Sequence, residues 1–421
     1  MNADIVIVGA GIAGLRCGIE LLHKRPQANI VILEKYNYKG GRVVTFKKTL
    51  QDVKGKCTQL QWENGAGRIH SSHTTVLDLI KKYKLNTFPL STEQFFTETG
   101  ELEPNRFDEL MELFAPSLQQ FQPSILATHT LRQLFQMLLK EKANDFLIQF
   151  PYRAEVDTLR ADCGLHSFED EMGTYDGYVV VKEGLSALIQ GMVKEFEDLG
   201  GHIQLGQTVT DIQKDNDIYL VKSKTKAGDV VWEAKTVICA LHSEALKQIP
   251  CFSNWSILKH LKMEPLLRTY AVFPTEKGES WFSDIGRTVC AGPIRYFIPM
   301  NPSCGTVMLS YTDGSDARRL LSILDKEGEE GLEDYLMKAI RKQFPQKTIP
   351  ESLFFKAHPW YEGCTYWLPG TYNVEELSEQ ALHPFPDTMP EVYCCGESFS
   401  LRQAWMEGAL EHADQLLKKF F

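Results

Sequence analysis

The spacing of apolar residues at the start of the chain predicts a strand, a helix and a second strand. One apolar run covers Ile5 to Val8, and another covers Ile30 to Leu33. Between them, apolar positions recur at the three- and four-residue intervals of an amphipathic helix. Strands that alternate with a helix in this way form a βαβ unit with parallel strands. We therefore expect the chain to begin with an α/β fold.

The turn between the first strand and the helix carries Gly9, Gly11 and Gly14 in the spacing Gly-x-Gly-x-x-Gly. In dinucleotide-binding folds the first glycine allows a tight turn, the second lets backbone amides approach a pyrophosphate, and the third lets the helix pack closely. The phosphates lie at the helix N-terminus, where free amides and the helix dipole favour negative charge. Glu34 follows after about 20 residues, where a carboxylate can bind an adenosine ribose. The alternative, a βαβ unit without a dinucleotide, fits this full context less well.

The same order of strand, helix and strand returns in the middle of the chain. Residues 178–213 contain an apolar strand, a helix that starts after Gly184 and ends at Gly200-Gly201, and a strand from His202 to Leu205. A further buried strand runs from Lys235 to Leu241. We expect these segments to extend the first α/β unit.

Other segments follow different periods. Residues 74–83 are predicted to form a helix, and residues 107–150 two or three amphipathic helices, with Thr130 as a helix cap. Residues 261–386 are typical of a mainly antiparallel sheet, with two helices between Ser315 and Gln343. The chain closes with an apolar strand and a helix that begins near Ala404 to Met406. The Lys-rich segment between Arg42 and Trp62 is predicted to be a loop.

Composition and charge narrow the class of protein. The 421 residues are enough for two domains, and 43% hydrophobic with 24% charged residues is ordinary for a globular protein. A net charge of −10 argues against a nucleic-acid partner. The ten cysteines lack metal-ligand spacing, so no metal site is expected. No window is apolar enough for a membrane span, and the first strand begins at Asp4 without a leader, which predicts a soluble, cytoplasmic or otherwise intracellular protein.

Two more glycine clusters follow the first one, Gly40-Gly41-Arg42 and Gly65-Ala66-Gly67-Arg68. Together with the glycine turn and Glu34, they resemble the N-terminal signature of the flavin-containing amine oxidases, the family of monoamine and polyamine oxidases. The resemblance implies FAD rather than NAD, bound without a covalent link. Monoamine oxidases carry a covalent flavin cysteine in the region of Cys364, but its distance from the following Pro-Gly differs here. A buried thiol is the more usual interpretation of Cys364.

The resemblance also assigns residues to the cofactor. The arginine of Gly-Gly-Arg lies by the pyrophosphate in that family, the Gly-Ala segment lies against the flavin, and a residue matching Val209 holds the adenine through its backbone. For Arg68 the alternative is a surface ion pair. The predicted cofactor residues are Gly9, Ala10, Gly11, Ala13, Gly14, Glu34, Lys35, Gly41, Arg42, Gly65, Ala66, Gly67, Arg68, Val209, Gly396, Glu397, Ala404, Trp405, Met406 and Ala409.

Three residues are candidates for the reacting end. Relatives often have a lysine that holds a water near flavin N5, and the matching position in this chain is Arg268. An arginine stays charged at neutral pH, so it could orient a water or a carboxylate but could not act as a base. A structural or solvent-facing role for Arg268 is the alternative. Tyr366 and Trp367 lie in a segment that forms an aromatic cage around the amine in relatives. Core packing is an equally good explanation for these two rings.

The fold expected from these observations is α/β, with a Rossmann-like FAD-binding domain interleaved with a substrate domain of mixed, mainly antiparallel sheet plus helices. The predicted boundaries are 1–75, 178–260 and 388–421 for the FAD domain, and 76–177 and 261–387 for the substrate domain.

The resemblance implies an FAD-dependent amine oxidase. A neutral small-molecule amine gives hydride to flavin N5, the imine hydrolyses, and O2 reoxidises the flavin to give H2O2. Two alternatives stay open: a related FAD oxidoreductase on a non-amine substrate, of desaturase or mutase type, and a flavin-stabilised binding protein without turnover. The sequence leaves the substrate open among monoamines, polyamines and amino acids. An Arg268 or Arg295 aimed at the substrate would indicate an amino acid, because it would bind the carboxylate. The sequence does not indicate an oligomeric state.

Overall fold

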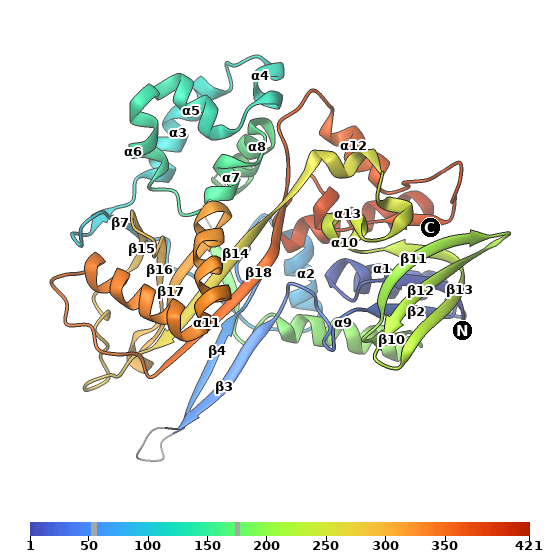
Figure 1. The fold of residues 1–421 in the computed structure, drawn as a ribbon, viewed down its shortest axis with the longest axis horizontal. Helices are drawn as coiled ribbons and strands as arrows, with labels where there is room; N and C mark the ends of the chain where they lie inside the picture. The colour runs from blue at the N-terminus through green and yellow to red at the C-terminus, as the bar shows by residue number, and fades with distance from the viewer. Residues whose placement is uncertain (52–56, 173–176) are drawn as a thin grey trace.

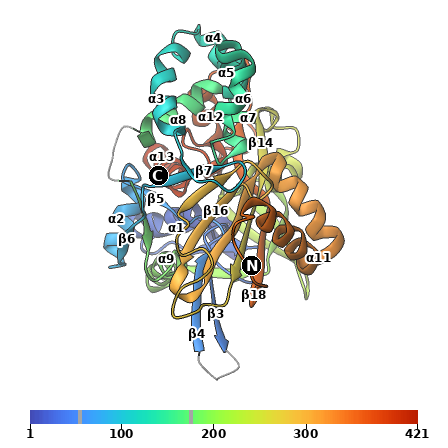
Figure 2. The ribbon, with the colours of Figure 1, turned by 90° about the vertical axis from the view of Figure 1, so that its left-hand side faces the viewer.

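The structure is a computed structural model that describes residues 1–51, 57–172 and 177–421. Two large sheets lie side by side, and a group of helices lies at the top of both views in Figures 1 and 2. The mixed α/β fold confirms the predicted fold class.

The first large sheet has the strand order β10-β2-β1-β13-β12-β11, and β19 pairs with β13. Its central strands are parallel, while β11, β12 and β13 form an antiparallel meander. The βαβ unit is present as predicted, with β1 at Asn2–Val8, α1 at Ile12–Lys24 and β2 at Ile30–Glu34. The remaining strands are β10 (His202–Leu205), β11 (Thr208–Asp215), β12 (Ile218–Thr225), β13 (Gly228–Cys239) and β19 (Val392–Cys394).

One face of this sheet packs against helices from three distant parts of the chain. These are α1, α2 (Thr74–Lys82), α9 (Ser186–Asp198) and α13 (Met406–Phe420), whose apolar residues share one core with the sheet. The predicted helix after Gly184 and the predicted closing helix are confirmed. The parallel strands β1, β2 and β13 therefore end at one edge, where ligands bind in folds of this kind.

The second large sheet has the order β18-β14-β17-β16-β15-β7-β8 and is antiparallel except for the pair β15 and β7. Its strands are β7 (Gln94–Thr97), β8 (Glu103–Pro104), β14 (Leu261–Val272), β15 (Arg287–Cys290), β16 (Tyr296–Asn301), β17 (Thr306–Asp313) and β18 (Phe354–Trp367). The long helix α11 (Gly314–Gln343) packs on this sheet. Its backbone breaks at Gly328, where φ is 74°, so the two predicted helices follow each other end to end.

The helical group has its own core. It contains α3 (Phe107–Leu118), α4 (Pro123–Thr128), α5 (Leu131–Leu139), α6 (Ala143–Leu147), α7 (Arg153–Asp157) and α8 (Ala161–Met172). Thr130 caps α5, as predicted: its side chain accepts from the Gln133 amide, and the Gln133 side chain accepts from the Thr130 amide. A small sheet of β5 (Ile69–His70), β6 (Thr87–Pro89) and β9 (Tyr178–Val181) also belongs to the fold.

The Lys-rich segment is not the loop that the sequence predicted. It contains a hairpin of β3 (Thr45–Gln51) and β4 (Cys57–Glu63), which extends at the bottom of Figure 1. The Phe46 ring stacks on Trp62 at a centroid distance of 4.7 Å, and Trp62 stacks on Tyr270 of β14 at 4.6 Å. Stacking between these rings, which are far apart in the sequence, stabilises the hairpin. The lysine-rich local sequence does not predict it.

Candidate active site

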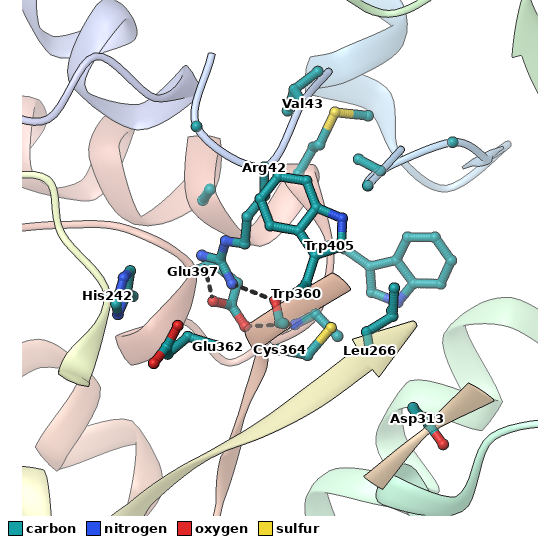
Figure 3. A pocket seen from close by; sticks show the side chains of 18 of the residues that line it. Arg42, Val43, His242, Leu266, Asp313, Trp360, Glu362, Cys364, Glu397 and Trp405 are labelled. Atoms are coloured by element: carbon teal, nitrogen blue, oxygen red, sulfur yellow. Dashed lines mark hydrogen bonds and ion pairs between the residues drawn. The ribbon is translucent and has the colours of Figure 1, made fainter. Parts of the chain in front are cut away.

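A cavity of about 1170 Å³ lies between the two large sheets. At one end it is lined by Glu34 and Val209, at the carboxyl edge of the first sheet. At the other end it is lined by Arg268 and Tyr311 of the second sheet. Figure 3 shows part of it, with Arg42, Glu397 and Trp405 around the open space. The cavity is thus elongated and built from segments far apart in the sequence.

The three glycines of the first turn have different roles. A Cβ on Gly9, where φ is 105°, would lie 2.6 Å from the Ala240 carbonyl oxygen, and a Cβ on Gly14 would lie 2.1 Å from the Gly9 carbonyl oxygen. Gly11 differs, because a Cβ there would have nothing within 4 Å. Packing therefore requires Gly9 and Gly14, while Gly11 leaves open space in the cavity at the start of α1. Among the described residues no side chain caps that helix end, and its first turn has no acidic residue, so this cradle fits a pyrophosphate.

The Glu34 carboxylate ends β2 and is buried. It accepts hydrogen bonds from the amides of Ala10 and Tyr36, both at 2.8 Å. Burial raises its pKa, although the backbone amides oppose the shift. The carboxylate is therefore held at the cavity wall beside the glycine turn, where it fits a ribose.

Arg42 and Glu397 join the two ends of the chain at the middle of the cavity. Their side chains form an ion pair at 2.9 Å, and Arg42 also donates to the Gly363 carbonyl at 2.8 Å. Glu397 accepts from the amides of Thr365 and Ala404, both at 2.9 Å. Ala404 has φ of 66°, a left-handed conformation that glycine adopts at lower cost.

Arg68 lies within a ring of aromatic side chains. Its Cζ is 5.1 Å from the ring centroid of Tyr152, 4.9 Å from that of Tyr178 and 5.8 Å from that of Trp405. Burial alone would lower the pKa of Arg68, but the surrounding tyrosines raise it, so the guanidinium stays charged. In the described part of the chain, no carboxylate forms an ion pair with Arg68, and the Tyr152 hydroxyl and Trp405 Nε1 are buried without hydrogen-bond partners. Two buried donors beside Arg68 therefore have unused hydrogen-bonding capacity within the described part of the chain.

Arg268 is a second guanidinium in the cavity, and this residue is buried, with 6% of its surface exposed. Its Cζ lies 4.7 Å from the Tyr311 ring centroid, and its Nη1 donates to the Glu63 carbonyl at 3.2 Å. Its Nε has no partner among the described residues. The Glu63 carboxylate instead accepts from the Leu185 amide and Thr45, and burial raises its pKa to about 7. Arg268 thus lines the cavity as a charged group that forms no ion pair among the described residues, although the Glu63 carboxyl lies near enough for the two charges to interact.

The structure separates the two aromatic candidates. Tyr366 lines the cavity, but Trp367 is fully buried in the core behind it and does not line it. The Trp367 indole donates to the Ser400 carbonyl at 3.1 Å. This corrects the prediction that Trp367 faces the substrate: side chains alternate along β18, so the two neighbours point to opposite faces.

The structure also locates Arg295, a candidate for binding a substrate carboxylate, and Cys364, the thiol in the region of the covalent flavin link. Arg295 lies outside the cavity and donates to the carbonyls of Cys290 and Phe150, so it is not available to a substrate. Cys364 lines the cavity, and burial raises the pKa of its thiol to about 12.

Most of the predicted cofactor residues line this one cavity, while Ala10 and Gly14 lie just behind its wall. The lining residues among them are Gly9, Gly11, Ala13, Glu34, Lys35, Gly41, Arg42, Gly65, Ala66, Gly67, Arg68, Val209, Gly396, Glu397, Ala404, Trp405, Met406 and Ala409. Sequence reasoning missed Tyr152, Tyr311 and Asp313, which line the inner end. A signal was present for Asp313, since a carboxylate ends a strand that contains no other charged residue.

The glycine cradle, the Glu34 carboxylate beside it and the long cavity are the features of an FAD-dependent oxidoreductase. Residues 12–415 match the flavin containing amine oxidoreductase family, and the chain belongs to that family. Its cofactor is FAD.

The chain is similar to other proteins over nearly its whole length. Aplysianin-A from Aplysia kurodai is 23% identical, over 99% of this chain and 90% of that protein. A putrescine oxidase A394C mutant matches with a TM-score of 0.75 at 16% identity, over 100% of this chain and 99% of the other. A putative protoporphyrinogen oxidase from Exiguobacterium sp. 255-15 matches with a TM-score of 0.73 at 15% identity, over 98% and 97%. At such identities these structures show the shared fold. None of the helices in the described ranges is both long and apolar enough to cross a membrane.

Proposed function

We propose that this protein oxidises a small amine that carries a carboxylate, as an α-amino acid does, with O2 as the electron acceptor. The observation that carries the proposal is the pair Arg68 and Arg268. Both guanidiniums line the inner end of the cavity, and neither forms an ion pair with a carboxylate of the described residues. A buried charge without a partner is costly, so a ligand that supplies the missing anion is strongly favoured.

The buried donors around Arg68 support the same class of substrate. The rings of Tyr152 and Trp405 lie against the guanidinium, and the Tyr152 hydroxyl and Trp405 Nε1 have no acceptor within the described residues. A carboxylate offers two oxygens with several lone pairs and can accept from an arginine and its neighbours at once. A simple alkylammonium ion brings only donors, and its neutral form offers a single lone pair, so most of these groups would stay unpaired. The site therefore favours an amino acid over the amine that lacks its carboxylate.

When bound, FAD supplies the electron-accepting chemistry of the reaction. The residues of this chain bind and orient the substrate: Arg68 and Arg268 hold the carboxylate, and the surrounding rings exclude water. Exclusion of water lowers the pKa of the substrate ammonium group and so favours the neutral amine that reacts. The overall reaction converts an amino acid, O2 and water to a 2-oxo acid, ammonia and H2O2.

The test is anaerobic mixing of the FAD-loaded protein with matched pairs of compounds. Each pair is an amino acid and the amine with the same side chain, such as leucine with isoamylamine, and putrescine is added as a diamine. We expect amino acids to bleach the flavin absorbance, with kcat/KM about 100-fold above that of the paired amine, the worth of a charge-assisted hydrogen bond. Equal bleaching by both members would overturn the carboxylate proposal. Bleaching by none of the compounds would instead support a non-amine substrate or a binding protein without turnover.

A further inference from the structure

Asp313 places a carboxyl group at the inner end of the same cavity. It ends β17, and Tyr311, two residues earlier on the same face of the strand, lines the cavity beside Arg268. Asp313 pairs in register with Leu266 of β14, another lining residue. In the view of Figure 3, Leu266 lies between Trp405 and Asp313. The carboxyl is thus near the proposed substrate position and on a rigid strand.

Only one oxygen of this carboxyl is used by the protein. Oδ1 accepts from the amides of Arg153 and Ala154, at 2.6 and 3.3 Å. Within the described ranges, no group donates to Oδ2. Asp313 precedes α11 as its N-cap residue, yet its side chain does not cap that helix. The two donor amides directly follow Tyr152, whose ring contacts Arg68, so the carboxyl is oriented next to the wall of the proposed carboxylate site.

The surroundings of Asp313 suit a group that exchanges a proton at neutral pH. Burial raises its pKa to about 7. The hydrogen bonds from the two amides and the charge of Arg295 lower the pKa, while the charge of Asp316 raises it further. A proton acceptor is most effective when its pKa lies near the working pH. The titratable or charged groups that act on it or on which it acts are Arg153 of α7, Asp316 of α11, Arg295 directly before β16, Tyr311 of β17, and Cys364 and Tyr366 of β18. Glu155 of α7 acts on the same two groups, Cys364 and Tyr366.

His358 is the strongest rival for this role. It lines the cavity, but its Nε2 accepts a hydrogen bond from Trp62 Nε1 at 2.9 Å, and burial lowers its pKa to about 4. That ring nitrogen is already used and binds a proton weakly at neutral pH. Asp313 has a free oxygen and the stronger affinity for a proton.

We propose that Asp313 is the catalytic base that takes the proton from the substrate's ammonium group, an inference that rests on the proposed function. The N–H bond breaks, its electron pair stays on nitrogen, and the proton forms an O–H bond at Asp313 Oδ2. No electron is transferred in this step. The neutral amine that results is the form from which the α-hydrogen can leave.

The test compares Asp313→Asn with the wild-type protein by anaerobic flavin reduction across pH. The asparagine keeps the side-chain shape, and its Oδ1 still accepts from Arg153 and Ala154. Asp334→Asn is the matched control, since Asp334 is an exposed carboxylate on α11 with the same charge change. A thermal melt of each variant confirms the fold. Wild-type and control reduction rates should rise with pH through a value near 7.

For Asp313→Asn we expect flavin reduction about 100-fold slower at pH 6.5, with the deficit shrinking as pH rises because the free substrate is then already neutral. A second readout is infrared difference spectroscopy with α-aminoisobutyrate, which lacks an α-hydrogen: wild type should gain a protonated-carboxyl band that the variant lacks. Wild-type rates at pH 6.5, or a deficit that is equal at every pH, would overturn the role of Asp313. If only simple amines reduce the wild type, the carboxylate proposal fails, and the same comparison with such an amine still tests Asp313.

Discussion

At the scale of single residues, Gly11 is expected to matter for cofactor binding and Gly14 for the stability of the fold. Gly11 has φ of −76°, which alanine also adopts, and a Cβ there meets no atom of the described residues within 4 Å. Gly11→Ala should therefore leave the melting temperature of the FAD-free protein unchanged and weaken FAD binding about tenfold or more, because the methyl group occupies the phosphate cradle. Calorimetry with added FAD measures this.

Gly14→Ala is the matched comparison. Its Cβ would lie 2.1 Å from the Gly9 carbonyl oxygen, so the helix must move away from the strand. We expect a loss of about 3 kcal/mol of stability even without FAD. Equal FAD-free melting temperatures for the two variants would contradict the division of roles between these glycines.

At the scale of elements, the capping box of α5 has a measurable effect. Thr130→Ala removes the side chain that accepts from the Gln133 amide. The cost should be about 1 kcal/mol, seen as roughly fivefold faster hydrogen exchange of the α5 amides. Thr130→Ser keeps the hydroxyl and should exchange like the wild type. Faster exchange in both variants would show that the methyl group, and not the cap, stabilises this helix end.

Elements with a strong local signal were predictable from the sequence. The βαβ unit, the helix after Gly184 and the capped α5 each carry their own periodicity and end signals. The β3–β4 hairpin was not predictable, because its stability comes from rings that stack across the chain, Trp62 on Tyr270. The placement of Trp367 needed the pairing of β18, since the segment reads as aromatic on both faces.

At the scale of the whole molecule, His412 links three elements and gives stability a pH dependence. Its Nδ1 accepts from the Gly396 amide at 3.2 Å, so its Nε2 donates to the Ser378 carbonyl of α12 (Val374–Ala381) at 3.0 Å. Burial lowers its pKa to about 4, against about 6.5 in the unfolded chain. The neutral ring therefore contributes stability that is present above pH 6.5 and is lost as pH falls towards 4.

His412→Asn tests this directly, since the asparagine oxygen can accept from Gly396 and does not titrate. Between pH 7.5 and pH 5 the wild type should lose about 2 kcal/mol more stability than the variant. Thermal melts of both proteins at the two pH values measure this difference in stability loss. The contributions of the other histidines are the same in both proteins and cancel. Parallel losses in both proteins would mean that His412 does not titrate in this range.

The site itself shows what only the assembled molecule provides. The dinucleotide-binding motif led to the glycines of the first turn and to Glu34, and the family resemblance led to Arg42 and Glu397. Tyr152 and Tyr311 belong to no motif, and they reach the cavity only because the helical group and the second sheet meet beside Arg68. The pairing state of Arg68 and Arg268 is likewise a property of the folded chain. The proposed substrate class depends on that pairing state.

The most direct measurement of the central claim is kcat/KM for an amino acid and its paired amine in wild type, Arg268→Met and Arg268→Lys. The methionine removes a buried charge that lacks a carboxylate partner, so the fold should be retained. We predict that Arg268→Met loses about 100-fold in kcat/KM for the amino acid, keeps the value for the amine, and is partly restored in Arg268→Lys. An equal loss for both substrates, or none for the amino acid, would contradict the account.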